Sequence, residues 1–357
     1  MQSGFFDLQD RHAQLSKQGD VLERLNAAID WELFRPVLAK LDVKARKSSA
    51  GRKPIDRILM LKMLIVQRLH NLSDESLEFQ VRDRLSFMRF LGLHLESSVP
   101  DARTRSLHKQ AFKEKLKAHG IADKLFDHFN AQLVRLGVGL KAGQMIDATF
   151  IPVPTQRNTR AQNETIKAGG VPTEWQEDPK TLAHKDVDAR WVKKNDISHY
   201  GYKNSINVDA KDKIITQWVV TDASVHDSQA FDAVVLSAAQ GGAVVYADSA
   251  YRSKETEELL QAQGMDSQIH ERNYQGKPLS SEQIKSNRIR SKTRSRVEHV
   301  FGHIQNSMGG KMIRTIGVAR AHVQIGLMNL VYNLSRVATL IRLGRMPMDR
   351  VCGELAF

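Results

Sequence analysis

Residues 143–154 read GQMIDATFIPVP, and the pattern of the chain changes at this stretch. Before it, apolar residues recur at helical spacing. Here they form a short run that contains one acid, Asp147, and that ends at prolines, which predicts a buried strand. The stretch therefore divides the chain into a helical first part and a second part that contains β-strands.

The second part continues with alternating strand and helix patterns. Residues 200–223, YGYKNSINVDAKDKIITQWVVTDA, hold two β-rich runs around the polar turn DAKDK, which predicts a hairpin. Residues 241–251, GGAVVYADSAY, predict another buried strand that ends at an acid, Asp248. Helices are predicted at 226–239 and 253–264, and a strand at 265–272. This order predicts a mixed α/β layer.

The first part, residues 1–138, is predicted to be helical. Apolar residues recur at helical spacing over 55–66, and Ser73 and Asp101 are expected to cap the two helices that follow. Over residues 1–140, Lys plus Arg exceed Asp plus Glu by 24 − 17 = 7. Simple helix packing with solvated basic faces and a helix-turn-helix-like DNA-binding unit both remain open.

Composition limits the classes of partner. The 357 residues carry a formal charge of +13, so the expected partner is a polyanion, with nucleic acid first and an anionic membrane second. The longest apolar run, 58–66, contains Lys62 and is far shorter than the roughly 18 residues of a membrane span. The N-terminus has no signal-peptide pattern. The one cysteine, Cys352, excludes a disulfide framework and fits a reducing cytoplasm.

A third acid stands beside a basic stretch. Residues 285–296, KSNRIRSKTRSR, hold six basic residues and no acid, and Glu298 follows in RSRVEHVFGHIQ. Taken singly, Asp147 and Asp248 are read as turn caps, and Glu298 as the partner of a surface salt bridge to Arg294. Together, three acids on separate elements indicate a Mg²⁺ site, because carboxylates suit that ion and two such ions can promote attack at a phosphodiester. Lys292, Arg294 and Arg296 are expected to hold the DNA phosphates.

Other residues compete for these roles. Asp222 is the main rival to Asp147, whereas Asp209 is expected in a turn, and His226 and Asp227 at a helix start. Two histidines, His299 and His303, have the i, i+4 spacing of zinc ligands. Their order, E-H-x-x-x-H, differs from the H-E-x-x-H of zinc proteases, so zinc is disfavoured, and no phosphate-binding P-loop is present.

In these residues the chain resembles a bacterial insertion-sequence DDE transposase, of the group whose type element is insertion sequence five. The resemblance runs from about residue 40 to 345. The stretches that carry it are GRKPIDRILMLKMLIVQRLHNLSDESLE, DRLSFMRFLGL, VPDARTRSLHKQ, MIDATFIPVP, YGYKNSINVDAKDKII, VTDASVHDS, YADSAYRS and RSRVEHVFGHIQ. Asp147, Asp248 and Glu298 match the three catalytic acids. The family usually has a lysine seven residues after the glutamate, where this chain has Gln305, a neutral amide that adds no charge.

The resemblance implies a ribonuclease-H-like mixed sheet flanked by helices, within a catalytic domain at 139–345, after a helical DNA-binding domain at 1–138. A polar stretch at 156–195 is expected to be a long loop or insertion, and 346–357 a tail. The implied activity is cleavage at transposon ends and joining of the freed 3′-hydroxyl to target DNA. The implied cofactor is Mg²⁺, for which Mn²⁺ can substitute. Tyr251, Arg252 and Gln305 join the expected DNA contacts.

The expected partners are the terminal inverted repeats and target DNA, both double-stranded, bound by a homodimer. The expected location is the bacterial cytoplasm at the nucleoid, without a membrane. Two alternatives stay open: a transposase-derived DNA-binding protein with impaired catalysis, and a metal-dependent nuclease of the same fold.

Overall fold

The computed structural model describes residues 6–40, 55–100, 120–138, 142–194, 196–274, 276 and 278–346. The expectations for Asp101 and Cys352 concern positions outside these residues. The chain forms two compact units, Met1–Gly137 with Leu330–Phe357, and Val138–Asn329. The division expected from the sequence kept residues 330–345 with the second part, whereas the compact units assign them to the first.

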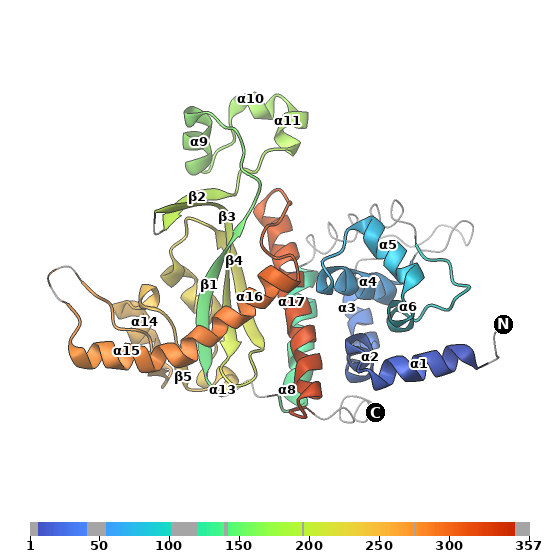
Figure 1. Ribbon diagram of the computed structural model, residues 1–357. Helices are drawn as coiled ribbons and strands as arrows, with labels where there is room; N and C mark the ends of the chain where they lie inside the picture. The colour runs from blue at the N-terminus through green and yellow to red at the C-terminus, as the bar shows by residue number, and fades with distance from the viewer. Residues whose placement is uncertain are drawn as a thin grey trace. The chain divides into compact units, whose positions relative to one another are not determined.

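The first unit is helical throughout its described residues (Figure 1). Asp56 begins α4 by accepting hydrogen bonds from the backbone N–H of Ile58 and Leu59. Ser73 caps α5 as predicted, because its hydroxyl accepts from the backbone N–H of Ser76. The elements are α1 (Asp7–Lys17), α2 (Val21–Ala28), η1 (Trp31–Phe34), α3 (Arg35–Ala39), α4 (Arg57–Leu69), α5 (Asp74–Asp83), α6 (Leu85–Leu91) and α8 (Ile121–Arg135), followed late in the chain by the end of α17 (Val318–Arg342).

The second unit is built on a mixed sheet. Its strands are β1 (Gln144–Pro152), β2 (Arg190–Lys194), β3 (Ile197–Asp209), β4 (Ile215–Asp222), β5 (Val244–Tyr246) and β6 (Asp266–Ser267). Their order is β2-β3-β1-β5-β6, and β4 also pairs with β3. Strand β3 pairs antiparallel with β1, β2 and β4, whereas β5 runs parallel to β1 and β6 parallel to β5. This is the ribonuclease-H-like arrangement expected from the sequence.

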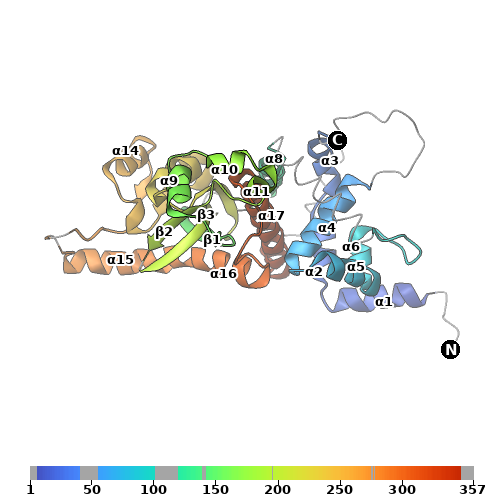
Figure 2. The same cartoon turned by 90° about the horizontal axis from the view of Figure 1, so that it is seen from above.

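The predicted hairpin is confirmed as β3 and β4. Asp209 lies in its turn, where the carboxylate accepts hydrogen bonds from the backbone N–H of Lys211 and Asp212. Helices cover both faces of the sheet, with α15 (Ser281–Arg294) and α16 (Glu298–Ser307) on one side and α14 (Lys254–Ala262) on the other (Figure 2). The short elements η2 (Asp227–Ala230), α12 (Phe231–Val234), α13 (Ala238–Gly241), η3 (Ser249–Tyr251) and η4 (Ser295–Val297) connect these layers.

The hydrophobic core on the α14 side includes Ile146, Phe231, Val245, Tyr251 and Leu260, each at most 1% exposed. Ser253 caps α14 and Gly264, at a φ of +66°, follows its end, both as predicted. The helix predicted at 226–239 is instead broken into η2, α12 and α13. Among the described residues, no helix has both the length and the apolar character that a membrane span requires.

The stretch at 156–195, expected to be a long loop or insertion, contains regular structure of its own. It contains α9 (Arg160–Lys167), α10 (Thr173–Gln176) and α11 (Pro179–Ala183), and ends in β2. Thr159 and Gln162 form a capping box at the start of α9. The carboxylate of Asp186, 2% exposed, fastens the insertion to the sheet because it accepts from the Tyr202 hydroxyl at 2.8 and 2.9 Å.

Candidate active site

Asp147 lies on β1, between β3 and β5 in the sheet. Its side chain is 15% exposed, and its Oδ1 accepts from the backbone N–H of Ala148 at 2.8 Å. Burial raises the pKa of Asp147 to about 6, and nearby Asp248 adds to this rise, whereas Arg294 opposes it. The carboxylate is therefore held in a place where its negative charge is only partly compensated.

Asp248 follows β5 at the same end of the neighbouring strand. Met145 and Tyr246 are register partners in the parallel β1–β5 pair, so Asp147 and Asp248 each come two residues after a paired position. Asp248 caps η3, since its Oδ1 accepts from the backbone N–H of Ala250 at 2.8 Å. Asp147, within β1, and Asp248, just after β5, therefore lie level with each other on adjacent strands, in agreement with their electrostatic coupling.

Glu298 is the first residue of α16, and Arg294 connects it to Asp147. The Arg294 guanidinium donates from Nη1 to Asp147 Oδ2 at 3.0 Å and from Nη2 to Glu298 Oε1 at 2.9 Å. The third nitrogen, Nε, is buried and has no hydrogen-bond partner among the described residues. One cation therefore bridges two of the three acids from strand to helix.

Asp147, Asp248 and Glu298 offer the type of ligand atom that a divalent cation prefers, but their side chains are not arranged around one cation position. Carboxylate oxygens are the ligands that Mg²⁺ prefers, and all three acids come from neighbouring elements. Among the described residues, however, no group of three His, Cys, Asp or Glu side chains is arranged to hold a metal ion. The guanidinium of Arg294 stands where a shared cation would neutralise Asp147 and Glu298.

Comparison with known protein families decides the class of the chain. Residues 139–334 match the family model described as a transposase DDE domain, which covers more than half of the chain. Residues 9–110 match a second model, described as a transposase domain (DUF772). The chain belongs to the DDE transposase family. No solved structure matches it at a significant level.

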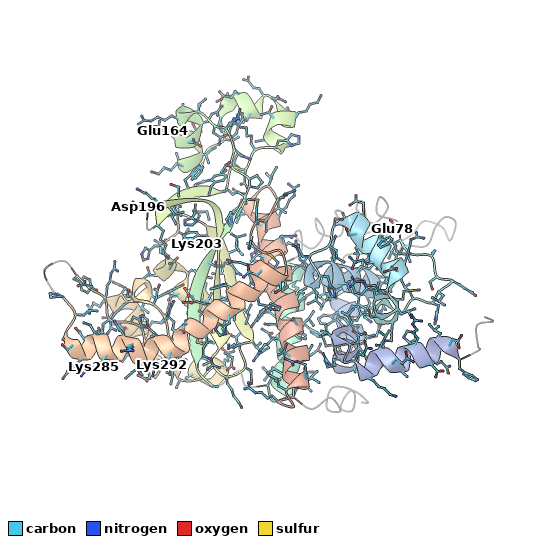
Figure 3. All side chains as sticks on the ribbon, viewed as in Figure 1. Glu78, Glu164, Asp196, Lys203, Lys285 and Lys292 are labelled. Atoms are coloured by element: carbon cyan, nitrogen blue, oxygen red, sulfur yellow. The ribbon has the colours of Figure 1, made fainter. Side chains whose placement is uncertain are left out.

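A DDE transposase cleaves or transfers nucleic acid, so it must bind DNA. Of the basic residues expected to contact DNA, Lys292 is exposed on the outer face of α15 (Figure 3). Lys285 and Arg288 lie on the same exposed face, at the helical spacing 285, 288, 292. We name these three residues the outer basic stripe of α15.

The inner face of α15 makes polar contacts, whereas its exposed side carries, as well as the stripe, Ile284 and Ile289, which are 56% and 67% exposed. Asn287 binds both backbone groups of Glu271, and Arg290 donates to the Ile269 carbonyl at 2.6 Å. No residue of α15 is buried. A helix held in place by polar contacts on one side leaves its other side free for a polyanion.

The remaining expected DNA contacts of this transposase lie in different settings. Arg296 is half-buried and donates to the Lys211 carbonyl at 3.4 Å, and Gln305 donates to the Thr149 hydroxyl at 3.1 Å. Arg252 forms an ion pair with Glu271 at 2.9 Å and donates a hydrogen bond to the Ile269 carbonyl. Tyr251 is 0% exposed within the core, so its side chain has no surface with which to touch a phosphate, and we do not carry it forward as a DNA contact.

The competing acids are engaged elsewhere. Asp222 accepts from the backbone N–H and hydroxyl of Ser224 in the turn after β4. Asp227 starts η2 and pairs with Lys203 at 2.8 Å. The Nδ1 of His299 lies 2.8 Å from Lys213 Nζ, which does not resemble a zinc ligand set.

Sequence reasoning missed one contact at the centre of the site, the one between Arg294 and Asp147. The i, i+4 spacing suggested the Arg294–Glu298 pair, which the structure contains. Nothing in the sequence marked the second partner, 147 positions earlier in the chain. Arg294 was assigned to a phosphate, whereas in the structure both of its terminal nitrogens are bound to acids.

Proposed function

We propose that this transposase cleaves the phosphodiester bond at the ends of its element and joins the freed 3′-hydroxyl to target DNA. Asp147, Asp248 and Glu298 are the proposed metal ligands, for Mg²⁺ or for Mn²⁺ as its substitute. The observation that carries the proposal is the Asp147–Arg294–Glu298 bridge next to Asp248, because it brings together acids from three elements around Asp147 of β1.

When bound, a divalent cation would activate the attacking oxygen and stabilise the leaving oxygen. The chain's own residues supply the remainder. The three carboxylates repel the DNA backbone until their charge is neutralised, and in the structure Arg294 neutralises two of them. A cation held by Asp147 and Glu298 would take over this neutralisation, and the guanidinium of Arg294 would then be available for a phosphate.

The outer basic stripe of α15 supports the DNA-binding part of the proposal. Lys285, Arg288 and Lys292 extend away from Glu298 along one helix face, as required to follow a phosphate backbone. Residues 1–140 carry a net charge of 24 − 17 = +7, and we propose that this first part makes further DNA contacts. We propose a homodimer on DNA, because a transposition reaction joins two ends, and a place of action at the bacterial nucleoid.

The test uses duplex DNA that carries the inverted repeats flanking the gene. Wild-type protein should nick this DNA and transfer the end in Mg²⁺ but not in chelator, while Asp248→Asn should bind it and leave it intact. Binding without cleavage in either Mg²⁺ or Mn²⁺ would contradict the proposal and support the impaired DNA-binding protein. Cleavage without joining would support the metal-dependent nuclease.

Gln305→Lys separates an impaired enzyme from an inactive one. The variant restores the positive charge that the family usually has seven residues after Glu298, at a side chain that now reaches Thr149. If the neutral amide limits the enzyme, the variant should bind and cleave end DNA more strongly than wild type. Equal cleavage by both proteins would show that Gln305 is fully adequate.

A further inference from the structure

The second unit contains a groove of about 610 Å³ where β1 passes into the insertion. The acids proposed for catalysis are not part of it. Its walls are Pro152–Thr155 after β1, Trp191 on β2, Ser198–Tyr200 on β3, and Met312 and Arg314 in the segment after α16. The lining contains a cation and no carboxylate. Such a groove suits a ligand that is both flat and negatively charged.

Trp191 gives the groove a flat apolar surface. Its side chain is 50% exposed, whereas Trp31, Trp175 and Trp218 are 3–7% exposed, and these four are all the tryptophans of the chain. The Trp191 ring packs against the buried Tyr200 ring, with centroids 5.0 Å apart and planes tilted by 34°. Trp191 is thus supported on one side and open on the other, the arrangement of a stacking platform.

The walls of the groove are held by the backbone. Val153 donates to the Tyr200 carbonyl at 3.1 Å, and Ile313 donates to the Pro152 carbonyl at 3.1 Å. Between them β3 passes so close to β1 that a Cβ on Gly201 would lie 2.4 Å from the Ile151 carbonyl oxygen. Only glycine fits there, since its φ is also +144°. The groove therefore does not need to form when a ligand arrives.

Trp191 and Tyr200, which line the groove, lie on the same face of the sheet as Asp147. Ile151 is four residues after Asp147 on β1, and its register partner is Tyr202, two residues from Tyr200 on β3. Tyr200 in turn is the partner of Trp191. From Asp147 to Val153 is six residues of extended chain, or about 20 Å. A DNA strand advances about 3.4 Å per nucleotide, so roughly six nucleotides connect the two sites.

We propose that the groove binds an unpaired nucleobase of the DNA, stacked on Trp191, with a neighbouring phosphate on Arg314. This inference rests on the proposed function, because it needs a DNA strand at the acids. Stacking on an aromatic ring tolerates every base, since each has a π-face. Arg314 is exposed and has no carboxylate partner among the described residues, so its charge is available to a phosphate.

The test uses the tryptophan fluorescence of the full chain. A fluorescently labelled single-stranded oligothymidylate is added, its binding is followed by anisotropy, and tryptophan emission is recorded with the unlabelled oligonucleotide. In wild type, binding should quench emission, since Trp191 is the exposed tryptophan. Trp191→Ala should abolish the quenching and weaken binding about tenfold. Trp191→Phe should abolish the quenching yet keep part of the affinity, because a ring remains.

Two controls restrict the result to the groove. Trp218→Phe removes a buried emitter that packs on His322 and should change neither the affinity nor the quenching. Arg314→Gln should weaken binding and lower the salt slope by about 0.7, while the bound state stays quenched. Heparin, a polyanion without bases, should not quench wild type.

Three outcomes would overturn the groove proposal: oligothymidylate that binds without quenching or does not bind at all, Trp191→Ala with wild-type affinity, or equal quenching by heparin. Cleavage of end DNA by wild type in Mg²⁺ is measured on the same preparation. Cleavage without quenching rejects the groove alone. Quenching without cleavage keeps the groove and rejects the proposed chemistry.

Discussion

The β1–β3 pair carries a charged cluster on each of its faces, and the two clusters differ in how completely they are closed. On one face Lys203 pairs with Asp227, and both side chains are about a tenth exposed, 8% and 11%. On the other face Arg294 bridges Asp147 and Glu298, whose side chains are 15% and 60% exposed. Asp147 and Phe150, the ring beneath Lys203, are three residues apart on β1 and therefore point to opposite faces.

The difference in exposure indicates which cluster can exchange its ion-pair partners for a bound ligand. Lys203 also donates to the Val225 carbonyl and lies 5.2 Å from the Phe150 ring, so its charge is fully engaged inside the protein. Arg294 has a buried Nε without a partner among the described residues, and Glu298 faces solvent. We infer that the Lys203 cluster fixes the fold and that the Arg294 cluster serves chemistry.

The largest expected effect concerns the buried pair of Lys203 and Asp227, the closed cluster. Asp227→Asn keeps the shape of the side chain but leaves the Lys203 charge buried without its counter-charge, which should lower the free energy of unfolding by about 3–5 kcal/mol. The denaturation midpoint measures this loss. Glu164→Gln, in the exposed Arg160–Glu164 pair, is the matched control and should cost less than about 1 kcal/mol. If both variants unfold alike, the closed cluster does not fix the fold.

The next effect concerns the open cluster, in which Arg294 bridges Asp147 and Glu298. Glu298→Gln should reduce cleavage of end DNA on the order of 10²–10³-fold, because a charge that stabilises the reacting centre is lost. The free energy of unfolding should change by less than about 1 kcal/mol, since the side chain is 60% exposed. Binding of end DNA in chelator, measured by gel shift, should be unchanged or slightly stronger. A large loss of stability would instead make Glu298 a structural residue.

A third prediction uses the pKa of Asp147, which burial raises to about 6. A raised folded-state pKa means that the folded chain binds the proton more tightly than the unfolded chain. The protonated Asp147 side chain therefore contributes to the free energy of unfolding below about pH 4, and this contribution is lost as pH rises through 6. The free energy of unfolding of Asp147→Asn, relative to that of wild type, should therefore be higher at pH 7.5 than at pH 4 by about 1–3 kcal/mol. Metal-free unfolding at both pH values measures this gain, and an equal difference at the two would refute it.

The smallest effect concerns the outer basic stripe. Lys292→Gln should weaken DNA binding uniformly across sequences and lower the slope of log K against log salt by about 1. Lys254→Gln, on α14 at the other face of the sheet, is the control and should leave the slope unchanged. Equal slopes for the two variants would remove the stripe from the DNA-contacting surface.

Local signals explain what the sequence could predict. The hairpin, the Ser73 and Ser253 caps and the strand at Asp147 depend on residues near one another in the chain, and the structure contains them. The Arg294–Glu298 pair was visible for the same reason. The three acids could also be selected from the residues themselves, and a family resemblance then supplied the sheet type and matched those acids to a catalytic set.

The failures of prediction are long-range. The helices of the insertion are short and polar, and Asp186 attaches them to Tyr202 and to the backbone of Gly317, a contact that no local pattern marks. Tyr251 is expected from the sequence to contact DNA. The 3₁₀ turn η3 instead directs that ring into the core. The second partner of Arg294 depends on how α15 packs against β1, and the open ring of Trp191 depends on how β2 pairs with β3.

The central claim is that Asp147, Asp248 and Glu298 form one metal site, and Mn²⁺ binding tests it most directly. Electron paramagnetic resonance of free Mn²⁺, recorded during titration of the metal-free full chain at neutral pH, gives the affinity. Asp147→Asn, Asp248→Asn and Glu298→Gln should each weaken binding by at least the roughly tenfold that loss of even an outer-shell partner costs. Wild-type affinity in any of the three variants would show that its residue is not a ligand and would contradict the shared site.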